Sequence, residues 1–434
     1  MKKNKRKKSK KNSFFNNIKS FFNNLTKTND DVKDNDDSEN IREVVVEKNN
    51  GFTTSEVIVI IFITTIFGLV CGYALSSSRS VNSESSENAL EIVETYESIL
   101  ENYYGEVDEE ELLNAAVSGM IDTLDDPYSL FMTSDTSDEF NETVDGSFVG
   151  VGVTVEWCDN TFRIAEVLSD SPAEKAKLEV NDYIIKVDDT SVEGMTLDEV
   201  SDLIRGEKGT KVVLTVLRDN EEVTFTVKRG LVEIPSVTSE IIEENIGYIT
   251  IDTFASNTSE QFEKQLKELE DEKIESLIID VRDNPGGRLA EVNDIMDLFL
   301  GKNKVLYKLE TKEKVEKVYT EDSTKRNYPV AVLVNYDSAS AAEILAASFQ
   351  DNYDNAILVG TVTYGKGTIQ KAVKLSSGAT IKYTTQKWLT PKGVWINDTG
   401  LTPEVLVEQG EDYCSNPTYS TDIQLQRAVE ELKK

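Results

Sequence analysis

Two side chains of this sequence are well suited to nucleophilic chemistry: a serine among small residues and a lysine between two glycines. Ser340 lies in the segment 335–345, which reads Asn-Tyr-Asp-Ser-Ala-Ser-Ala-Ala-Glu-Ile-Leu, and Lys366 stands between Gly365 and Gly367. The 434-residue chain contains no histidine. It therefore cannot form a Ser-His-Asp triad, a Cys-His pair or an HExxH zinc site. A lysine is the remaining candidate for a general base.

A lysine can act as this base only in an unusual environment. Lysine titrates near pH ~10.4, so burial and neighbouring charges must lower its pKa by roughly 3 units before it accepts a proton at neutral pH. We therefore expect Lys366 to lie in a pocket with little water. The alternative for a lysine in such a loop is a solvated surface charge.

The segments around Ser340 predict a strand-to-helix turn. Residues 329–334 are a short apolar run typical of a buried strand, and residues 341–349 are an alanine-rich run typical of a helix. The first N–H groups of such a helix have no intrahelical partner, and the helix dipole favours negative charge there. The N–H of Ala341 is thus a candidate oxyanion donor. The alternative is that Ser338 and Ser340 only cap a core helix.

A third segment, 277–288, is an apolar strand that ends in a glycine pair. It reads Leu-Ile-Ile-Asp-Val-Arg-Asp-Asn-Pro-Gly-Gly-Arg. Without a Cβ, the backbone at Gly286 and Gly287 can approach a substrate closely. The N–H of Gly287 is a candidate second oxyanion donor, and an ordinary turn is the alternative.

In combination, these three segments resemble the carboxy-terminal processing protease family. Its members carry D-x-R-x-N-x-G-G, S-A-S-A-S-E and G-K-G-x-x-Q segments in this order, and the resemblance covers roughly residues 88 to 408. It implies Ser340 as nucleophile, Lys366 as general base and Gln370 as the residue that orients the lysine. It also implies Gly287 and Ala341 as the oxyanion donors, with no metal and no cofactor.

The same resemblance assigns a structural frame and exposes one departure. Asp280, Arg282 and Asn284 match the frame at the end of the strand, and Glu343 is retained. Ala342 stands where the family usually has a serine. Because that serine is not the nucleophile, the change bears on packing more than on chemistry.

Upstream, residues 146–156 read Gly-Ser-Phe-Val-Gly-Val-Gly-Val-Thr-Val-Glu, and with the segments up to Lys228 they resemble a PDZ domain. Such a glycine-rich segment exposes N–H groups that can bind a terminal carboxylate, and the next strand edge can pair with an extended tail. The expected substrate-binding residues are Val149, Gly150, Val151, Gly152 and Val153. The alternation of the three valines predicts one strand with an apolar face. Ordinary turn glycines are the alternative.

The N-terminal region predicts a membrane anchor. Residues 1–11 are mostly lysine and arginine, whereas residues 57–75 are an uncharged apolar run. This run is long enough to span a bilayer core at about 1.5 Å per residue. The basic flank favours a cytoplasmic N-terminus and an exported protease, in a single-pass arrangement at the cell membrane. A cleavable signal peptide is less expected, because the run begins too far from the N-terminus.

Charge and cysteine content exclude other classes. The net charge is −33 although residues 1–11 are basic, so nucleic-acid binding by the acidic remainder is not expected. The three cysteines do not form a disulfide framework. We leave Cys158 and Cys414 unpaired.

The predicted fold is an α/β multidomain chain. Its parts are a cytoplasmic tail (1–56), a transmembrane helix (57–75), a linker (76–86), a helical region (87–140), a β-rich PDZ domain (141–230), an α/β Ser/Lys peptidase core (231–408) and a C-terminal helical segment (409–434). By family resemblance, the N-terminal and C-terminal helices can form a homodimer interface.

The sequence thus predicts a membrane-anchored serine endopeptidase that binds and cleaves the C-terminal tails of polypeptides. The first alternative is a membrane-tethered scaffold that binds C-terminal peptides with an inactive protease fold. The second is a serine hydrolase acting on small amides. The PDZ-like module favours polypeptide substrates over small amides.

Overall fold

The computed structural model describes residues 83–158, 160–243 and 245–434. The basic tail, the predicted transmembrane segment 57–75 and most of the predicted linker lie outside these residues. Among the described helices, none is both long and apolar enough to cross a bilayer. The chain divides into two units, Met1–Ile92 and Val93–Lys434, and the elements described below belong to the second unit apart from residues 83–92.

The predicted helical region contains three helices and one short strand. They are α3 (Ser83–Asn102), α4 (Glu109–Asp122), β1 (Leu130–Met132) and α5 (Ser134–Asp145). Asp108 caps α4, because its Oδ1 accepts the N–H groups of Glu110 and Glu111 at 2.9 and 3.0 Å. The left-handed Gly146, with φ 64°, ends α5 and turns the chain into the next domain.

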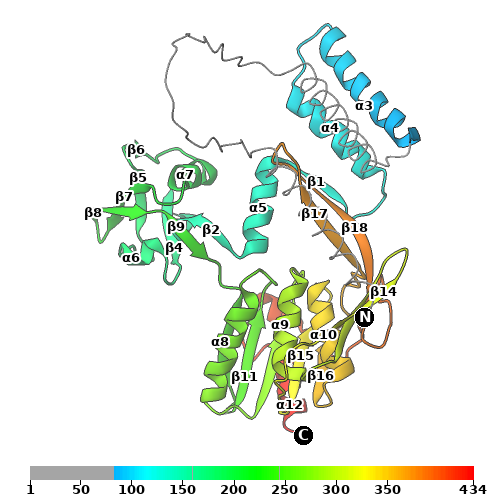
Figure 1. The fold of residues 1–434 in the computed structure, drawn as a ribbon. Coiled ribbons are helices and arrows are strands. Elements are labelled where there is room, and N and C mark those ends of the chain that lie inside the picture. The colour runs from blue at the N-terminus through cyan, green and yellow to red at the C-terminus, as the bar shows by residue number, and fades with distance from the viewer. Residues whose placement is uncertain (1–82, 159, 244) are drawn as a thin grey trace, which may run out of the picture. The chain divides into compact units, whose positions relative to one another are not determined.

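Residues 147–233 form a domain of strands and short helices (Figure 1). Its buried side chains make one apolar core. The main sheet has the order β3-β4-β5-β7-β8, with β6 beside β5, and β2 pairs separately with β9. The elements are β2 (Ser147–Gly150), β3 (Val153–Cys158), β4 (Thr161–Val167), α6 (Pro172–Lys175), β5 (Tyr183–Val187), β6 (Thr190–Ser191), α7 (Leu197–Ile204), β7 (Lys211–Arg218), β8 (Glu221–Lys228) and β9 (Gly230–Glu233).

The single strand predicted over Val149–Val153 is wrong in one respect. The chain turns at Gly152, with φ 84°, so that β2 and β3 belong to different sheets. A Cβ at Gly152 would lie 2.3 Å from the Cβ of Ser171. Only glycine allows this close approach, and the close approach separates the two strands.

The peptidase region contains a six-stranded sheet of order β10-β11-β12-β15-β16-β19, in which only the β10–β11 pair is antiparallel. Its elements are β10 (Val237–Ile242), β11 (Ile246–Ile251), α8 (Thr258–Asp271), β12 (Ser276–Asp280), α9 (Leu289–Leu300), β15 (Val330–Val334), α10 (Ala341–Asn352), β16 (Ala356–Gly360), β19 (Val405–Leu406), α11 (Glu411–Ser415) and α12 (Ile423–Leu432).

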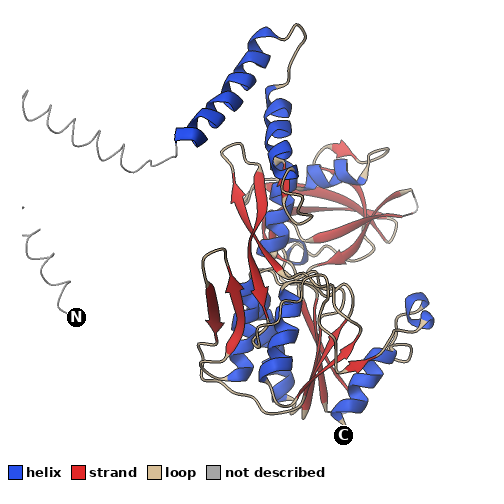
Figure 2. Ribbon diagram, turned by 90° about the vertical axis from the view of Figure 1, so that its right-hand side faces the viewer, coloured by secondary structure: helices blue, strands red, loops and turns tan. Residues whose placement is uncertain are grey.

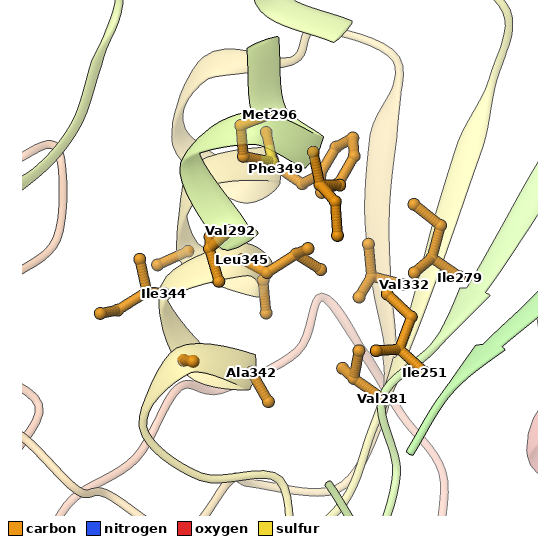
Figure 3. Packing of buried hydrophobic residues seen from close by; sticks show 14 of the residues in the cluster. Ile251, Ile279, Val281, Val292, Met296, Val332, Ala342, Ile344, Leu345 and Phe349 are labelled. Atoms are coloured by element: carbon orange, nitrogen blue, oxygen red, sulfur yellow. The ribbon is translucent and has the colours of Figure 1, made fainter. Parts of the chain in front are cut away.

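Helices cover both faces of this sheet (Figure 2). One apolar cluster joins the strands to α8, α9 and α10, and a second joins them to α12. All residues of β12 and β15 are buried, as expected for parallel strands covered on both faces. In Figure 3, Ala342 and Leu345 of α10 point toward Val281 and Val332. The departure at Ala342 therefore lies in an apolar core that needs no hydroxyl group.

A second sheet combines β1 with later segments. Its path is β1-β18-β13-β14, and β17 pairs with β18. The strands are β13 (Val305–Glu310), β14 (Val315–Tyr319), β17 (Thr368–Lys374) and β18 (Thr380–Leu389). The β17–β18 hairpin begins just after the loop formed by Gly365, Lys366 and Gly367. This loop, called the lysine loop, is thus carried by the second sheet.

Candidate active site

Ser340 lies at the predicted turn, between β15 and α10. The preceding turn is fixed by Ser338, whose Oγ donates to the Val281 carbonyl at 2.7 Å and accepts the N–H of Asn335 at 2.9 Å. Ser340 itself has φ 55° and ψ −113°. A residue with a side chain adopts this backbone only where the surrounding structure imposes it, and such residues cluster at functional sites. Ser338 thus has a structural role, whereas Ser340 combines the N-cap position of α10 with a strained backbone conformation.

The glycine pair lies directly against this turn. A Cβ at Gly286 would lie 2.8 Å from the Cβ of Ser340 and 2.9 Å from the N of Ala341. Gly287 forms a parallel bridge with Phe254, whose N–H donates to Gly286 and whose carbonyl accepts from Arg288. Among the described residues, neither Gly287 nor Ala341 donates its N–H to a protein acceptor. Two unpaired N–H groups therefore belong to the two segments that meet at the serine.

The buried carboxylate of Glu343 connects the serine turn to the lysine loop. Its Oε2 accepts the N–H of Ser340 and the N–H of Lys366, both at 2.9 Å. Its Oε1 accepts the N–H of Gly365 at 2.8 Å and the hydroxyl of Thr363 at 2.6 Å. Burial raises the pKa of Glu343, and these four hydrogen bonds act against that rise. The sequence identified Glu343 only as a retained residue, and this bridging role was missed.

Two tryptophans hold the carbonyl groups of the lysine loop. Trp388 Nε1 donates to the Lys366 carbonyl at 2.7 Å, and Trp395 Nε1 donates to the Gly367 carbonyl at 3.0 Å. Asn397 Oδ1 accepts the N–H of Gly367 at 3.1 Å. Three side chains from later in the sequence thus hold the backbone of this loop. Sequence reasoning missed both indoles, because their spacing from Lys366 along the chain indicates no partner.

Lys366 is half-buried, with its Nζ 4.8 Å from the centre of the Tyr128 ring. Burial lowers the pKa of Lys366, and the positive charge of Lys382 lowers it further. The negative charges of Glu343 and Asp126 act in the opposite direction. The pKa of Lys366 therefore moves in the direction that a neutral base requires.

Gln370 is on β17 and follows Lys366 in the sequence after three intervening residues. Its Nε2 donates to the hydroxyl groups of Thr368 and Thr384 at 3.0 and 3.1 Å. No hydrogen bond joins Gln370 to Lys366 within the described chain. A direct orienting role for Gln370 stays a prediction.

Arg282 and its partners hold the strand end against the C-terminal helix. Its guanidinium pairs with Asp280 at 2.6 Å and with Asp422, the N-cap of α12, at 2.8 Å. Burial alone would raise the pKa of Asp422, but the contacts with Arg282 outweigh it and hold that pKa below its usual range. The frame predicted around Asp280, Arg282 and Asn284 is thus a buried network. Asn284 contributes a bond from its amide to the Ile251 carbonyl at 2.7 Å.

A separate groove of about 250 Å³ lies in the 147–233 domain. Four of the five predicted substrate-binding residues line it, namely Gly150, Val151, Gly152 and Val153, whereas Val149 does not. The opposite wall is α7, which contributes Leu197, Asp198, Ser201, Ile204 and the adjacent Arg205. The sequence missed this wall, although the Thr196–Glu199 capping box marks the start of the helix.

Three family models match the chain. They are peptidase family S41 over residues 245–407, a PDZ domain over residues 163–218 and the activating protease CtpB N-terminal domain over residues 72–136. The S41 match contains Ser340, Lys366 and both glycines of the pair, and the PDZ match lies within the domain that carries the groove.

Relatives with similar sequences carry the same family name. The chain is 37% identical over 352 residues to carboxy-terminal processing protease CtpB of Bacillus subtilis (strain 168), covering 79% of this chain and 73% of that protein. It is 39% identical over 329 residues to carboxy-terminal processing protease CtpA of the same organism, covering 75% and 70%. A solved structure titled photosystem II D1 C-terminal processing protease is 26% identical, covers 75% of this chain and 88% of that chain, and has a TM-score of 0.43. The chain therefore belongs to the carboxy-terminal processing protease family of S41 peptidases.

Proposed function

We propose that this chain is a serine endopeptidase that cuts polypeptides near their C-termini with a Ser340/Lys366 dyad. The observation that carries the proposal is the Glu343 carboxylate, which binds the backbone of both residues. The lowered pKa of Lys366 supports it further, because a neutral lysine is the form that accepts a proton.

In the proposed reaction, neutral Lys366 takes the proton of Ser340 Oγ as the oxygen attacks a peptide carbonyl. The N–H groups of Gly287 and Ala341 bind the oxyanion of the tetrahedral intermediate. When that intermediate collapses, the lysine transfers its proton to the leaving amine and an acyl-enzyme remains. A water molecule then gives a proton to the lysine and attacks the ester. When this second intermediate collapses, the lysine returns the proton to Ser340 Oγ and the carboxyl product leaves. Each oxyanion donor contributes about 10² to 10³ in rate.

We propose that the groove between the Gly150–Val153 segment and α7 binds the C-terminal tail of the substrate. The N–H groups of the segment suit a terminal carboxylate, and Arg205 adds a positive charge at the rim. Val151, Val153 and Ile204 give the groove an apolar wall. We therefore expect the last residue of a bound tail to be apolar.

The test is cleavage of an unfolded protein with an apolar C-terminal tail, followed by mass spectrometry of the products. The full chain is compared with Ser340→Ala, Lys366→Ala and the matched control Lys371→Ala, an exposed lysine on β17. Only the unaltered chain and the control should cut, and amidation of the tail should slow them. Tail binding without cleavage by the unaltered chain would favour the scaffold alternative, whereas cleavage of small amides but not of the tailed protein would favour the amidase alternative.

We propose that the protease is anchored in the cell membrane by residues 57–75, with the N-terminus in the cytoplasm and the protease outside. The support is the uncharged apolar run and the lysine-rich flank in the sequence. Intact cells treated with trypsin should lose the S41 domain and retain a fragment of the basic tail. Protection of the S41 domain in intact cells and its cleavage after lysis would contradict the proposal.

We also propose that the chain forms a homodimer through its N-terminal helices. No residue of α4 is buried. Leu113 and Met120, seven residues apart on this helix, and Leu124, just beyond its end, are exposed apolar side chains. A group of such side chains marks an interaction surface. Leu113→Glu with Met120→Glu should convert the dimer to a monomer in analytical ultracentrifugation, whereas Glu111→Gln should not. A monomeric unaltered chain would contradict the proposal and would leave the dyad untouched.

A further inference from the structure

A second half-buried lysine, Lys382, lies close to the candidate base and has no role in the reaction described above. It is on β18, where it pairs with Ala372 of β17 and with Leu130 of β1. Its Nζ lies 5.3 Å from the centre of the Phe140 ring, which belongs to α5. No ion pair to Lys382 is present among the described residues. Burial of an ammonium group without a carboxylate partner lowers the stability of a fold. A lysine kept in this position is therefore a candidate for a functional role.

The register of the hairpin places Lys382 on the active-site face. Side chains alternate along a strand, so Lys382 and Thr384 point to the same side of β18. Thr384 accepts a hydrogen bond from Gln370, which pairs with it across the hairpin. The N–H of Thr384 donates to Ser129, the neighbour of Tyr128, and Tyr128 carries the Lys366 ammonium on its ring. This face therefore joins the two lysines through Gln370, Thr384 and Tyr128.

We propose that Lys382 is a positioning residue of the reaction: its positive charge, held against Phe140, disfavours a proton on Lys366 and so keeps the base neutral. This inference rests on the proposed Ser340/Lys366 dyad. Two ammonium groups in one poorly hydrated region titrate as a coupled pair, and removal of one restores the proton affinity of the other. A cationic neighbour is one of the known ways to activate a lysine.

The charges around the pair are consistent with this role. Burial is the largest influence that lowers the pKa of Lys366, and Lys382 is the next. The negative charges of Asp126 and Glu343 raise the pKa of Lys366 and so oppose both influences. Without Lys382, only these two negative charges would act on Lys366 within this group. Burial also lowers the pKa of Lys382.

The remaining groups near the pair do not replace Lys382. On α5, the carboxylate of Asp138 pairs with Lys374 at 3.2 Å. Burial raises the pKa of Tyr128, so this ring stays a neutral phenol at neutral pH. Among the described residues, Lys382 is thus the positive charge that acts on Lys366.

The experiment is the pH dependence of kcat/KM for the full chain, with Lys382→Met, Lys382→Arg and the control Lys371→Met. Lys371 belongs to the same hairpin but is exposed. In Lys382→Met, the acid limb of the profile should move to a higher pH by about 1 pH unit. At a given pH on this limb, kcat/KM should therefore fall roughly tenfold. At high pH, kcat/KM should return to the value of the unaltered chain. Lys382→Arg keeps the charge and should keep the limb in place, as should Lys371→Met.

Two outcomes would overturn the inference while the dyad stands. One is a uniform loss in Lys382→Met at every pH, which indicates a role in folding or substrate binding. The other is an equal upward shift in Lys382→Arg, which shows that charge is not the cause. Full activity in Lys366→Ala would instead remove the dyad, and the inference with it.

A direct titration covers the case in which Lys382→Met does not fold. The lysines of the Ser340→Ala chain are reductively methylated with ¹³C, and the Lys366 resonance is identified by its loss in Lys366→Ala. In the Lys382→Gln chain this resonance should titrate at a higher pH than in its parent. An unchanged titration would overturn the inference.

Discussion

The indole of Trp388 donates a hydrogen bond of 2.7 Å to the backbone carbonyl of Lys366. Trp388 is fully buried, so no solvent molecule replaces this donor when the side chain is changed. An unsatisfied buried carbonyl costs roughly 1–3 kcal/mol. The lysine loop relieves this cost by moving, and Lys366 moves with it.

Trp388→Phe should therefore lower kcat by roughly 10- to 100-fold, because a small displacement of the base is enough to lose that much rate. KM should change little, because Trp388 does not line the tail groove. Steady-state kinetics on a tailed substrate measures both constants. Trp157→Phe, an exposed tryptophan on β3, is the control and should behave like the unaltered chain. A loss confined to KM would contradict the assignment.

Gly287→Ala should abolish most of the activity. Gly287 has φ 143°, and a Cβ there would lie 2.3 Å from the Phe254 carbonyl oxygen. The glycine pair must therefore shift, and its N–H leaves the oxyanion position. We expect a loss of about 10² to 10³ in kcat with tail binding retained. Gly119→Ala on α4 meets no atom within 4 Å and should leave activity unchanged. A Gly287→Ala enzyme with full kcat would remove Gly287 from the oxyanion site.

Glu343→Gln should disrupt the site more than its small change in shape suggests. The two carboxylate oxygens accept four donors, whereas an amide offers one oxygen and turns its own N–H groups toward two of them. We expect activity to fall by about 10² or more and the free energy of unfolding to fall by roughly 1–3 kcal/mol. Denaturant unfolding and kinetics measure the two effects. The control is Glu263→Gln, an exposed glutamate on α8. Unchanged activity in Glu343→Gln would refute the bridging role.

The Arg282–Asp422 pair should make stability depend on acid. The pKa of Asp422 in the fold lies below its usual 3.8, so the ionised form is favoured in the native state. This contribution is fully present above the unfolded pKa and is lost as the pH falls through the folded pKa. Asp422→Asn should cost roughly 3 kcal/mol near neutral pH, because a buried guanidinium loses one of its carboxylates.

The measurement is urea unfolding of both proteins from neutral pH down to about pH 2. The difference in unfolding free energy between them should shrink as the pH falls. Asp412→Asn, a neighbouring acid without an ion pair among the described residues, provides the control. A difference that stays constant with pH would show that the pair does not titrate as described.

Arg205→Ala should weaken the capture of free C-terminal tails. Arg205 lines the groove and is exposed, so its charge contributes only a modest amount. We expect a two- to fivefold, or about 0.5–1 kcal/mol, loss of affinity for a tail with a free carboxylate and none for the amidated tail. Fluorescence anisotropy with the Ser340→Ala chain measures both. Lys208→Ala, in the same loop but outside the groove, should have no effect, and an equal loss for the amidated tail would argue against carboxylate binding.

The sequence predicted what is encoded locally. The strand, turn and helix around Ser340 are contiguous in the chain, and each has a clear pattern of its own, so the turn was found without a structure. The same holds for the glycine pair and for the α/β alternation of the core. The strand over Val149–Val153 was predicted wrongly because apolar alternation does not reveal a turn at Gly152, which depends on packing against Ser171.

The residues that fix the site were not predictable in this way. Glu343, Trp388 and Trp395 act on Lys366 and its neighbours across 22 to 28 residues of chain. Lys382 acts on the same lysine only because the β17–β18 hairpin folds back. Spacing along the sequence carries no information about such contacts until the sheet register is known.

The residues that hold the lysine loop lie later in the sequence than the loop itself, and this order matters while the chain is being synthesised. Trp388, Trp395 and Asn397 all follow Lys366, so a chain still emerging from the ribosome lacks three of the side chains that hold this loop. The hydrolytic machinery assembles only when the last third of the S41 domain has closed around it. A copy that ends before Trp388 should therefore lack peptidase activity.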